Sequence, residues 1–189
     1  MWHLRTMECP NINLIQKKKY PDSKFRDLAD QFKMRLLDTS NIQLREFIGD
    51  EVPPYAILSH TWGKEEVSYQ GLSGARSTKG FQKILRCCTL AKSEGYDYVW
   101  IDTCCIDKTS SAELSEGINS MYRWYANAAI CYAYLADVSL WPDIPNTKSF
   151  EESRWFSRGW TLQELLAPQT VIFYDHDWNR LGTRASREA

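Results

Sequence analysis

Residues 98–108 read YVWIDTCCIDK, and the sequence SSAE follows at residues 110–113. The first four residues are apolar or aromatic, as expected of a buried β-strand, and the strand ends in the acidic residue Asp102. Ser110 stands three positions before Glu113, which is the capping-box spacing of a helix N-terminus. A strand that ends in an acid and leads into a helix with a second acid in its first turn is typical of sites in open α/β sheets.

The segments on either side of this stretch alternate between strand-like and helix-like patterns. Runs of apolar and aromatic residues predict strands, whereas apolar residues at three- and four-residue spacing predict helices. Gly95 stands where a helix C-cap glycine belongs. We predict strands at residues 34–37, 55–58, 98–101, 129–135 and 170–174, a helical turn at 44–47, helices at 80–95, 110–125 and 155–166, and a loop at 141–148. This order predicts an α/β fold, with a mostly parallel sheet flanked by helices in three layers.

Length and composition indicate one compact unit with little affinity for polyanions. A chain of 189 residues that is 43% hydrophobic is long enough to bury a core as one domain. The formal net charge of -1 argues against binding to nucleic acid or to anionic membranes, which need clustered positive charge. No apolar run approaches the roughly 20 residues of a membrane-spanning helix. We therefore expect a cytoplasmic protein.

The beginning of the chain differs in pattern from the rest. Residues 1–33 combine a lysine run at 17–19 with prolines and scattered apolar residues that follow no sustained period. We expect a poorly packed extension there and place the folded domain at residues 34–189.

The cysteines and histidines give no pattern of a metal site. Two pairs, Cys87-Cys88 and Cys104-Cys105, are adjacent in sequence and cannot easily form internal disulfides, so we expect reduced thiols. Zinc would need cysteines and histidines at ligand spacing, and His3, His60 and His176 are scattered. We predict no metal site.

Three polar blocks follow apolar runs and combine tryptophan with groups that form hydrogen bonds. They are LSHTWG at residues 58–63, the stretch from Trp100 to Lys108, and RGWTLQE at residues 158–164. Together with MRLLDT at residues 34–39, they resemble the heterokaryon incompatibility (HET) domain of filamentous fungi. The resemblance extends over residues 34 to about 182.

The resemblance also carries expectations about the ends of the chain. Residues 1–33 have no counterpart in the usual start of the family, and HET domains often continue beyond the point at which this chain stops. We therefore expect either a fragment or an imperfect gene model, with Met34 as the natural start and a domain truncated at its C-terminus.

The resemblance implies a function in programmed cell death after fusion of incompatible cells. The family's domains usually form the N-terminal part of larger receptor-like proteins, so the implied partners are NLR-like regulatory domains or further copies of the domain. The family is also thought to be distantly related to Toll/interleukin-receptor (TIR) domains, which have a flavodoxin-like sheet. TIR domains can cleave the nicotinamide glycosidic bond of NAD with a glutamate on a helix. NAD would then be a substrate, and no bound cofactor is implied.

Glu113 is the candidate for that catalytic glutamate. Each helical residue advances about 100° around the axis, so Glu113 lies at the flank of a predicted buried stripe and Glu116 lies almost opposite it. The stripe consists of Leu114, Ile118, Met121, Tyr122 and Tyr125. Glu113 would bind the ribose and stabilise the developing oxocarbenium ion. The alternative is that its carboxylate serves only the capping box with Ser110.

The other candidate residues would bind the substrate, and each also has a structural interpretation. Asp102 could orient a ligand or form an Asx turn. His60, with Ser59, could contact a ligand or form a structural hydrogen bond. Trp160, Gln163 and Glu164 suit a planar base, whereas their structural interpretation is a buried Trp with a satisfied polar partner. Trp62 is the remaining candidate, but for Trp62, Trp100 and Trp155 we favour packing in the core.

The motifs argue against two further enzyme classes. Cys105, His60 and Asp102 could in principle form a cysteine hydrolase set, but no nucleophile elbow surrounds Cys105, which favours simple packing. The dinucleotide-binding motif Gly-x-Gly-x-x-Gly is absent from the sequence. Its absence argues against redox use of NAD but not against hydrolysis of NAD. Two functional hypotheses remain: NAD hydrolysis, and a non-enzymatic death module that self-associates or recruits an effector.

Overall fold

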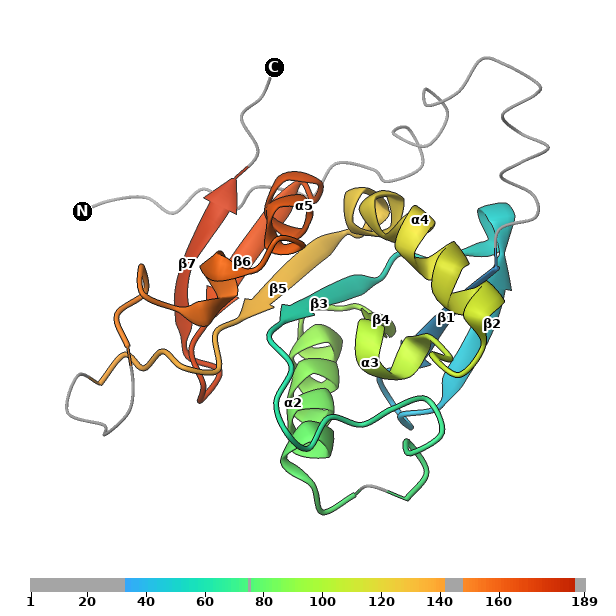
Figure 1. The fold of residues 1–189 in the computed structure, drawn as a ribbon, viewed down its shortest axis with the longest axis horizontal. Coiled ribbons are helices and arrows are strands. Elements are labelled where there is room, and N and C mark those ends of the chain that lie inside the picture. Colours follow the sequence, from blue (N-terminus) through green and yellow to red (C-terminus); the bar gives the residue numbers. More distant parts are fainter. Residues whose placement is uncertain (1–32, 75, 142–147, 186–189) are drawn as a thin grey trace.

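The computed structural model describes residues 33–74, 76–141 and 148–185, and these form one seven-stranded sheet with helices on both faces (Figure 1). The strand order is β2-β1-β4-β3-β5-β6-β7. The strands are β1 (Lys33–Asp38), β2 (Leu44–Ile48), β3 (Ala56–His60), β4 (Tyr98–Ile101), β5 (Ile130–Tyr134), β6 (Thr170–Tyr174) and β7 (Arg180–Ala185). The helices are α2 (Lys79–Ser93), α3 (Asp102–Cys105), α4 (Ser111–Asn127) and α5 (Thr161–Leu166), with 3-10 turns η3 (Gly49–Glu51) and η4 (Arg154–Ser157).

The centre of the sheet is parallel and its edges are antiparallel. Strands β4, β3, β5 and β6 pair in parallel, whereas β1 and β2 on one side and β7 on the other pair antiparallel to their neighbours. The predicted α/β fold, with a mostly parallel sheet flanked by helices, is confirmed. The C-terminal hairpin partner β7 was not expected from the sequence.

The chain reverses its direction across the sheet at β4, and this places the helices on opposite faces. The connection from β3 to β4 runs one way through α2, and the connection from β4 to β5 runs back across β3 through α3 and α4. Because such crossovers are right-handed, α2 covers one face and α4 and α5 cover the other (Figure 1). Ligand sites of open α/β sheets lie where neighbouring strands send their connections to opposite faces. Here that position is between the carboxyl ends of β3 and β4.

Large aromatic residues fill the core between the sheet and α4. Trp100 is 1% exposed, and its ring centroid lies 5.2 Å from that of Trp124. Trp155 is fully buried on the same side as α5. The expected core role of Trp100 and Trp155 is confirmed.

Several local predictions were wrong. Residues 44–47 form strand β2 rather than a helical turn, because they pair with β1 as a hairpin. The helix expected at 155–166 is divided into η4 and α5, since the extended backbone of Arg158 (φ -90°, ψ 136°) interrupts it. In α4 the buried residues are Gly117, Ser120, Trp124 and Tyr125, whereas Ile118 and Tyr122 are 45% and 57% exposed. The packing of Trp124 on Trp100 accounts for this rotation.

Other predictions are confirmed or fall outside the described residues. Gly95 has φ +89° and ends α2, as the C-cap prediction required. The N-terminal extension to residue 32 and most of the predicted loop, residues 142–147, lie outside the described ranges. Among the helices that the structure describes, none has the length and apolar character needed to cross a bilayer.

Candidate functional site

Glu113 lies in the first turn of α4, and an arginine from strand β1, the neighbour of β4 in the sheet, holds its carboxylate. Arg35, on β1, donates to both carboxylate oxygens, with Nη2 2.8 Å from Oε2 and Nη1 on Oε1. The backbone N–H of Asp107 also donates to Oε1, at 2.7 Å. The three hydrogen bonds fix the carboxylate and leave Oε2 with one acceptor position, because a carboxylate oxygen can accept two.

The capping box at the start of α4 is only half formed. The Ser110 hydroxyl accepts the Glu113 N–H at 3.4 Å, so Ser110 is the N-cap, as predicted. The Ser110 N–H, however, donates to the carbonyl of Asp107 at 3.2 Å and not to Glu113. The carboxylate of Glu113 is therefore not used by the cap and faces Arg35.

A pocket of about 220 Å³ adjoins this carboxylate. We call it the Glu113 pocket; it is lined by Lys33, Arg35, Trp100, Cys105, Ile106, Ser110, Ala112, Glu113, Glu116, Gly117 and Trp124. Desolvation acts to raise the pKa of Glu113, but the hydrogen bonds from Arg35 and Asp107 outweigh it and hold the pKa below its usual value. Glu113 is thus an ionised, oriented acid beside two tryptophans. Glu116 is exposed, as expected.

A second set of polar residues gathers at the carboxyl ends of β3 and β4. We call His60, Trp62, Glu66, Lys83 and Asp102 the His60 cluster. His60 Nε2 lies 3.1 Å from Asp102 Oδ1, and the Trp62 indole N–H donates to Asp102 Oδ2 at 2.9 Å. Burial would raise the pKa of Asp102, but these contacts and the charge of Lys108 hold it below its usual value. Trp62 is 51% exposed, so its interpretation as a core residue is wrong.

The hydrogen-bond pattern fixes the form of the His60 ring. Lys83 Nζ lies 2.8 Å from His60 Nδ1 and 2.5 Å from Glu66 Oε1. Because an ammonium group can only donate, Nδ1 accepts and Nε2 carries the hydrogen that Asp102 accepts. His60 is thus held between the Asp102 carboxylate on Nε2 and the Lys83 ammonium on Nδ1, and Lys83 also pairs with Glu66.

Ser59 and Glu164 form a separate buried contact. The Ser59 hydroxyl donates to Glu164 Oε2 at 2.5 Å and accepts the Trp155 indole N–H at 2.7 Å. Burial raises the pKa of Glu164, and the Ser59 hydrogen bond and the charge of Arg158 offset this only in part. Arg158 Nη1 lies 3.9 Å from Glu164 Oε2 and donates to the His60 carbonyl at 2.7 Å.

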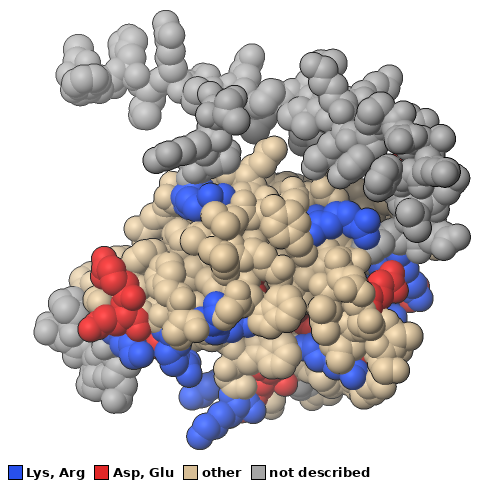
Figure 2. All heavy atoms as spheres, turned by 45° about the horizontal axis from the view of Figure 1, so that its top comes forward, with Lys and Arg blue, Asp and Glu red and all other residues tan. Residues whose placement is uncertain are grey.

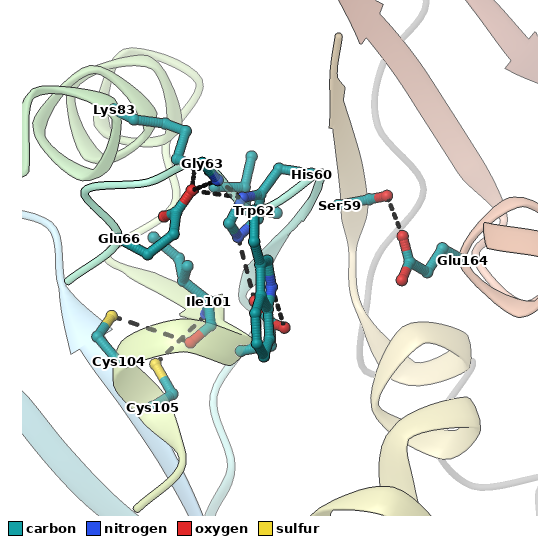
Figure 3. A network of polar contacts seen from close by, with 12 residues as sticks. Ser59, His60, Trp62, Gly63, Glu66, Lys83, Ile101, Cys104, Cys105 and Glu164 are labelled. Atoms are coloured by element: carbon teal, nitrogen blue, oxygen red, sulfur yellow. Dashed lines mark hydrogen bonds and ion pairs between the residues drawn. The ribbon is translucent and has the colours of Figure 1, made fainter. Parts of the chain in front are cut away.

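Successive side chains of a strand point to opposite faces, and this separates two of the predicted groups. Ser59 points toward α5 and His60 points toward α2, as Figure 3 shows. The structure thus brings His60, Trp62 and Asp102 together, and Ser59 and Glu164 together. In the described residues, Glu113 makes no hydrogen bond or ion pair with either group.

Residues 106–108 lie between the Glu113 pocket and the His60 cluster. Ile106 lines the pocket, Asp107 donates to Glu113, and the Lys108 ammonium lies 3.6 Å from the ring centroid of Trp62. The two sites are therefore neighbours along one loop. This loop follows β4 and the short helix α3, near the position that strand topology marks for ligands.

Trp160 and Gln163 lie apart from these contacts. Trp160 is 49% exposed, and its side chain forms no described hydrogen bond. The Gln163 Nε2 atom is buried without a hydrogen-bond partner among the residues that the structure describes. Their predicted role in substrate binding stays a prediction.

Several residues that build the site were not predicted. Arg35, Asp107, Lys83 and Arg158 each form a hydrogen bond with a predicted residue, and Glu66 in turn binds Lys83. One sequence signal was available: Arg35 is a charged residue within the apolar run at 34–37 and is 11% exposed in its side chain. A buried arginine needs an acidic partner, but the partner is 78 residues away in sequence.

The cysteines are buried and make no catalytic arrangement in the described ranges. Burial raises the pKa of Cys88 to about 12, and Cys105 Sγ accepts the backbone N–H of Ile101 at 3.3 Å (Figure 3). Cys105 makes no described contact with His60, as its packing interpretation requires. No group of three or more metal-binding side chains converges in the part of the chain that the structure describes.

Comparison with known proteins adds a family match to this geometry. A family model described as Heterokaryon incompatibility protein (HET) matches residues 55–143. The chain is also 48% identical over 168 residues to the Vegetative incompatibility protein HET-E-1 of Podospora anserina, over 82% of this chain and 12% of that protein. The chain thus spans a small part of this relative's length. No solved structure matches the chain.

Proposed function

Because this chain belongs to the heterokaryon incompatibility (HET) family, we propose that it is a cell-death effector module of fungal allorecognition that hydrolyses the nicotinamide glycosidic bond of NAD. The observation that carries this proposal is the state of Glu113. Its carboxylate is not used by the helix cap, is ionised, and faces a pocket with tryptophan walls.

The proposed reaction uses Glu113 as an electrostatic group. The bond between the ribose C1′ and the nicotinamide nitrogen breaks, and nicotinamide leaves as a neutral molecule with the bonding electron pair. Glu113 accepts a hydrogen bond from one ribose hydroxyl through the remaining position of Oε2 and stabilises the positive charge that develops on the sugar. Water then forms the new bond to C1′ and releases a proton, which gives ADP-ribose.

The size of the pocket supports only partial enclosure of the substrate. Pockets that enclose a drug-sized ligand measure roughly 300–1,000 Å³. The Glu113 pocket, at about 220 Å³, suits the nicotinamide and its ribose. The rest of the dinucleotide would extend along residues 106–108, where Lys108 and the half-exposed Trp62 offer a cation and an aromatic face.

A non-enzymatic death module is the second candidate, and an exposed apolar surface favours it. Helices α4 and α5 contact each other and present exposed apolar side chains, and uncharged side chains occupy most of this face (Figure 2). They are Ile118 at 45%, Tyr122 at 57%, Leu162 at 63% and Leu166 at 56% exposure. Such a surface suits self-association or effector recruitment.

We also propose how the module is regulated and where in the cell it acts. Since this chain aligns with 12% of HET-E-1, we propose that regulatory domains of the NLR type act on it from outside the aligned region. We place its action in the cytoplasm, where NAD is available as substrate.

Expression in fungal host cells tests the two candidates against each other. The chain would be induced as wild type, as Glu113→Gln and as Glu151→Gln, with cellular NAD and viability measured together. Glu151 is exposed and does not line the Glu113 pocket, so we expect NAD loss and death with the wild type and with Glu151→Gln, and neither with Glu113→Gln. Death at unchanged NAD would contradict hydrolysis and favour the second candidate.

A further inference from the structure

The loop that follows β3 is fixed to the core and to α2 close to its start. Val67 is 2% exposed and inserts into the core. Glu66 Oε1 accepts hydrogen bonds from Lys83 at 2.5 Å and from the Gly63 N–H at 2.6 Å. The first half of this loop is therefore anchored to the His60 cluster.

The loop also approaches α2 too closely for any side chain to intervene. A Cβ atom at Gly80 would lie 2.1 Å from the carbonyl oxygen of Glu65, so only glycine fits there. The Glu65 carboxylate accepts the Lys79 N–H at 3.0 Å. The loop has a fixed path where it passes the start of α2.

Two later residues of the loop contact the groups that hold Glu113. The Arg35 guanidinium carbon lies 4.6 Å from the ring centroid of Tyr69, a cation–π contact. Gln70 Nε2 donates to Asp107 Oδ1 at 2.6 Å. Arg35 and the Asp107 N–H are the donors to Glu113, so the loop contacts both of them.

We infer that loop residues 61–74 position Glu113, and that Tyr69 and Gln70 are its positioning residues, acting through Arg35 and Asp107. Tyr69 restricts the guanidinium plane so that it faces the carboxylate. Gln70 holds the turn at Asp107 whose N–H completes the set of donors. The consequence for catalysis rests on the proposed function, but the placement and charge of Glu113 do not.

Carbon-13 NMR titration of the Glu113 carboxyl carbon in the full chain tests this directly, with Glu113→Gln for assignment. We expect Tyr69→Ala and Gln70→Ala each to raise the pKa of Glu113, because weaker donors stabilise the carboxylate less. Tyr69→Phe keeps the ring and Ser73→Ala changes an exposed loop residue, so both should give the wild-type titration. Tyr69→Leu, which keeps apolar bulk without an aromatic face, replaces Tyr69→Ala if that variant does not fold.

The same variants separate this inference from the proposed function. If the wild type releases nicotinamide, Tyr69→Ala should lower the rate by roughly tenfold to a hundredfold, because misplacing a reacting group costs this much. If the wild type releases none, the NMR titration still decides the inference. A Glu113 titration unchanged in folded Gln70→Ala and in folded Tyr69→Ala or Tyr69→Leu would overturn it.

Discussion

Arg35 Nη2 donates to Glu113 Oε2 at 2.8 Å, and this contact joins strand β1 to the first turn of α4. The two residues are 78 positions apart in sequence, with side-chain exposures of 11% and 27%. The placement of the candidate catalytic acid therefore depends on a strand beyond the parallel part of the sheet.

Replacing Arg35 should destabilise the fold measurably. Arg35→Met keeps the apolar stem but leaves a half-buried carboxylate without its charged donor, which should lower the free energy of unfolding by about 1–3 kcal/mol. Urea denaturation measures this. Lys92→Met is the matched control, because both partners of the Lys92–Asp97 pair are exposed and such pairs contribute about 0–1 kcal/mol. Equal effects of the two variants would contradict the structural importance of the Arg35 contact.

The stabilisation by Glu113 should disappear in acid. Desolvation opposes ionisation of Glu113, but Arg35 and Asp107 hold its pKa below the usual 4.5. Since the folded pKa is lowered, the stabilising effect is complete above about pH 4.5 and is lost as pH falls through the folded pKa. The difference in unfolding free energy between wild type and Glu113→Gln should therefore shrink below that pH. A constant difference from pH 7 to pH 3 would show that the carboxylate gains nothing from its partners.

The contribution of Glu164 to stability should have the opposite dependence on pH. Burial raises its pKa, so its contribution to stability falls as pH rises from about 4.5 through the folded pKa. Gln keeps an oxygen that can accept the Ser59 hydroxyl but carries no charge. We expect Glu164→Gln to equal or exceed the wild type in thermal stability at pH 7. A marked loss of stability at that pH would mean that the charge on Glu164 is needed in the fold.

The hydrogen bond between Asp102 and Trp62 should depend on the charge of Asp102. His60 and Trp62 donate to different oxygens of Asp102, and Asp102→Asn replaces one of these oxygens with an NH2 group, so the donor that faces this group loses its acceptor. The cost should be about 1–3 kcal/mol in unfolding free energy. The proton shift of the Trp62 indole N–H, identified with Trp62→Phe, reports the bond directly. An unmoved indole signal in Asp102→Asn would contradict the described contact.

The sequence predicts the central sheet and part of the site for reasons that the structure makes clear. The strands at 55–58, 98–101 and 170–174 are short, apolar and bounded by polar residues. Because β3 and β4 are parallel, the residues after both strands lie at one edge, which brings His60 near Asp102. The separation of Ser59 from His60 also follows from the alternation of side chains along a strand.

The orientation of α4 and the contacts of Glu113 depend on long-range interactions that local sequence patterns do not encode. The rotation of α4 is set by Trp124 against Trp100, two aromatic residues on different elements, and not by the spacing of Ile118 and Tyr122. The Glu113 carboxylate fits the capping-box pattern in sequence, yet a charged donor from β1 offers it a stronger hydrogen bond than the cap.

We propose that the Glu113 carboxylate promotes cleavage of the nicotinamide bond of NAD. The most direct measurement is nicotinamide release, quantified by chromatography, when the purified and concentrated full chain is incubated with NAD. We predict release by the wild type and by the control Glu151→Gln, which lies outside the pocket, and a fall of at least about a hundredfold in Glu113→Gln, since removing a group that stabilises transition-state charge costs this much. Equal release by wild type and folded Glu113→Gln, or none by the concentrated wild type while it still kills cells, would contradict the claim.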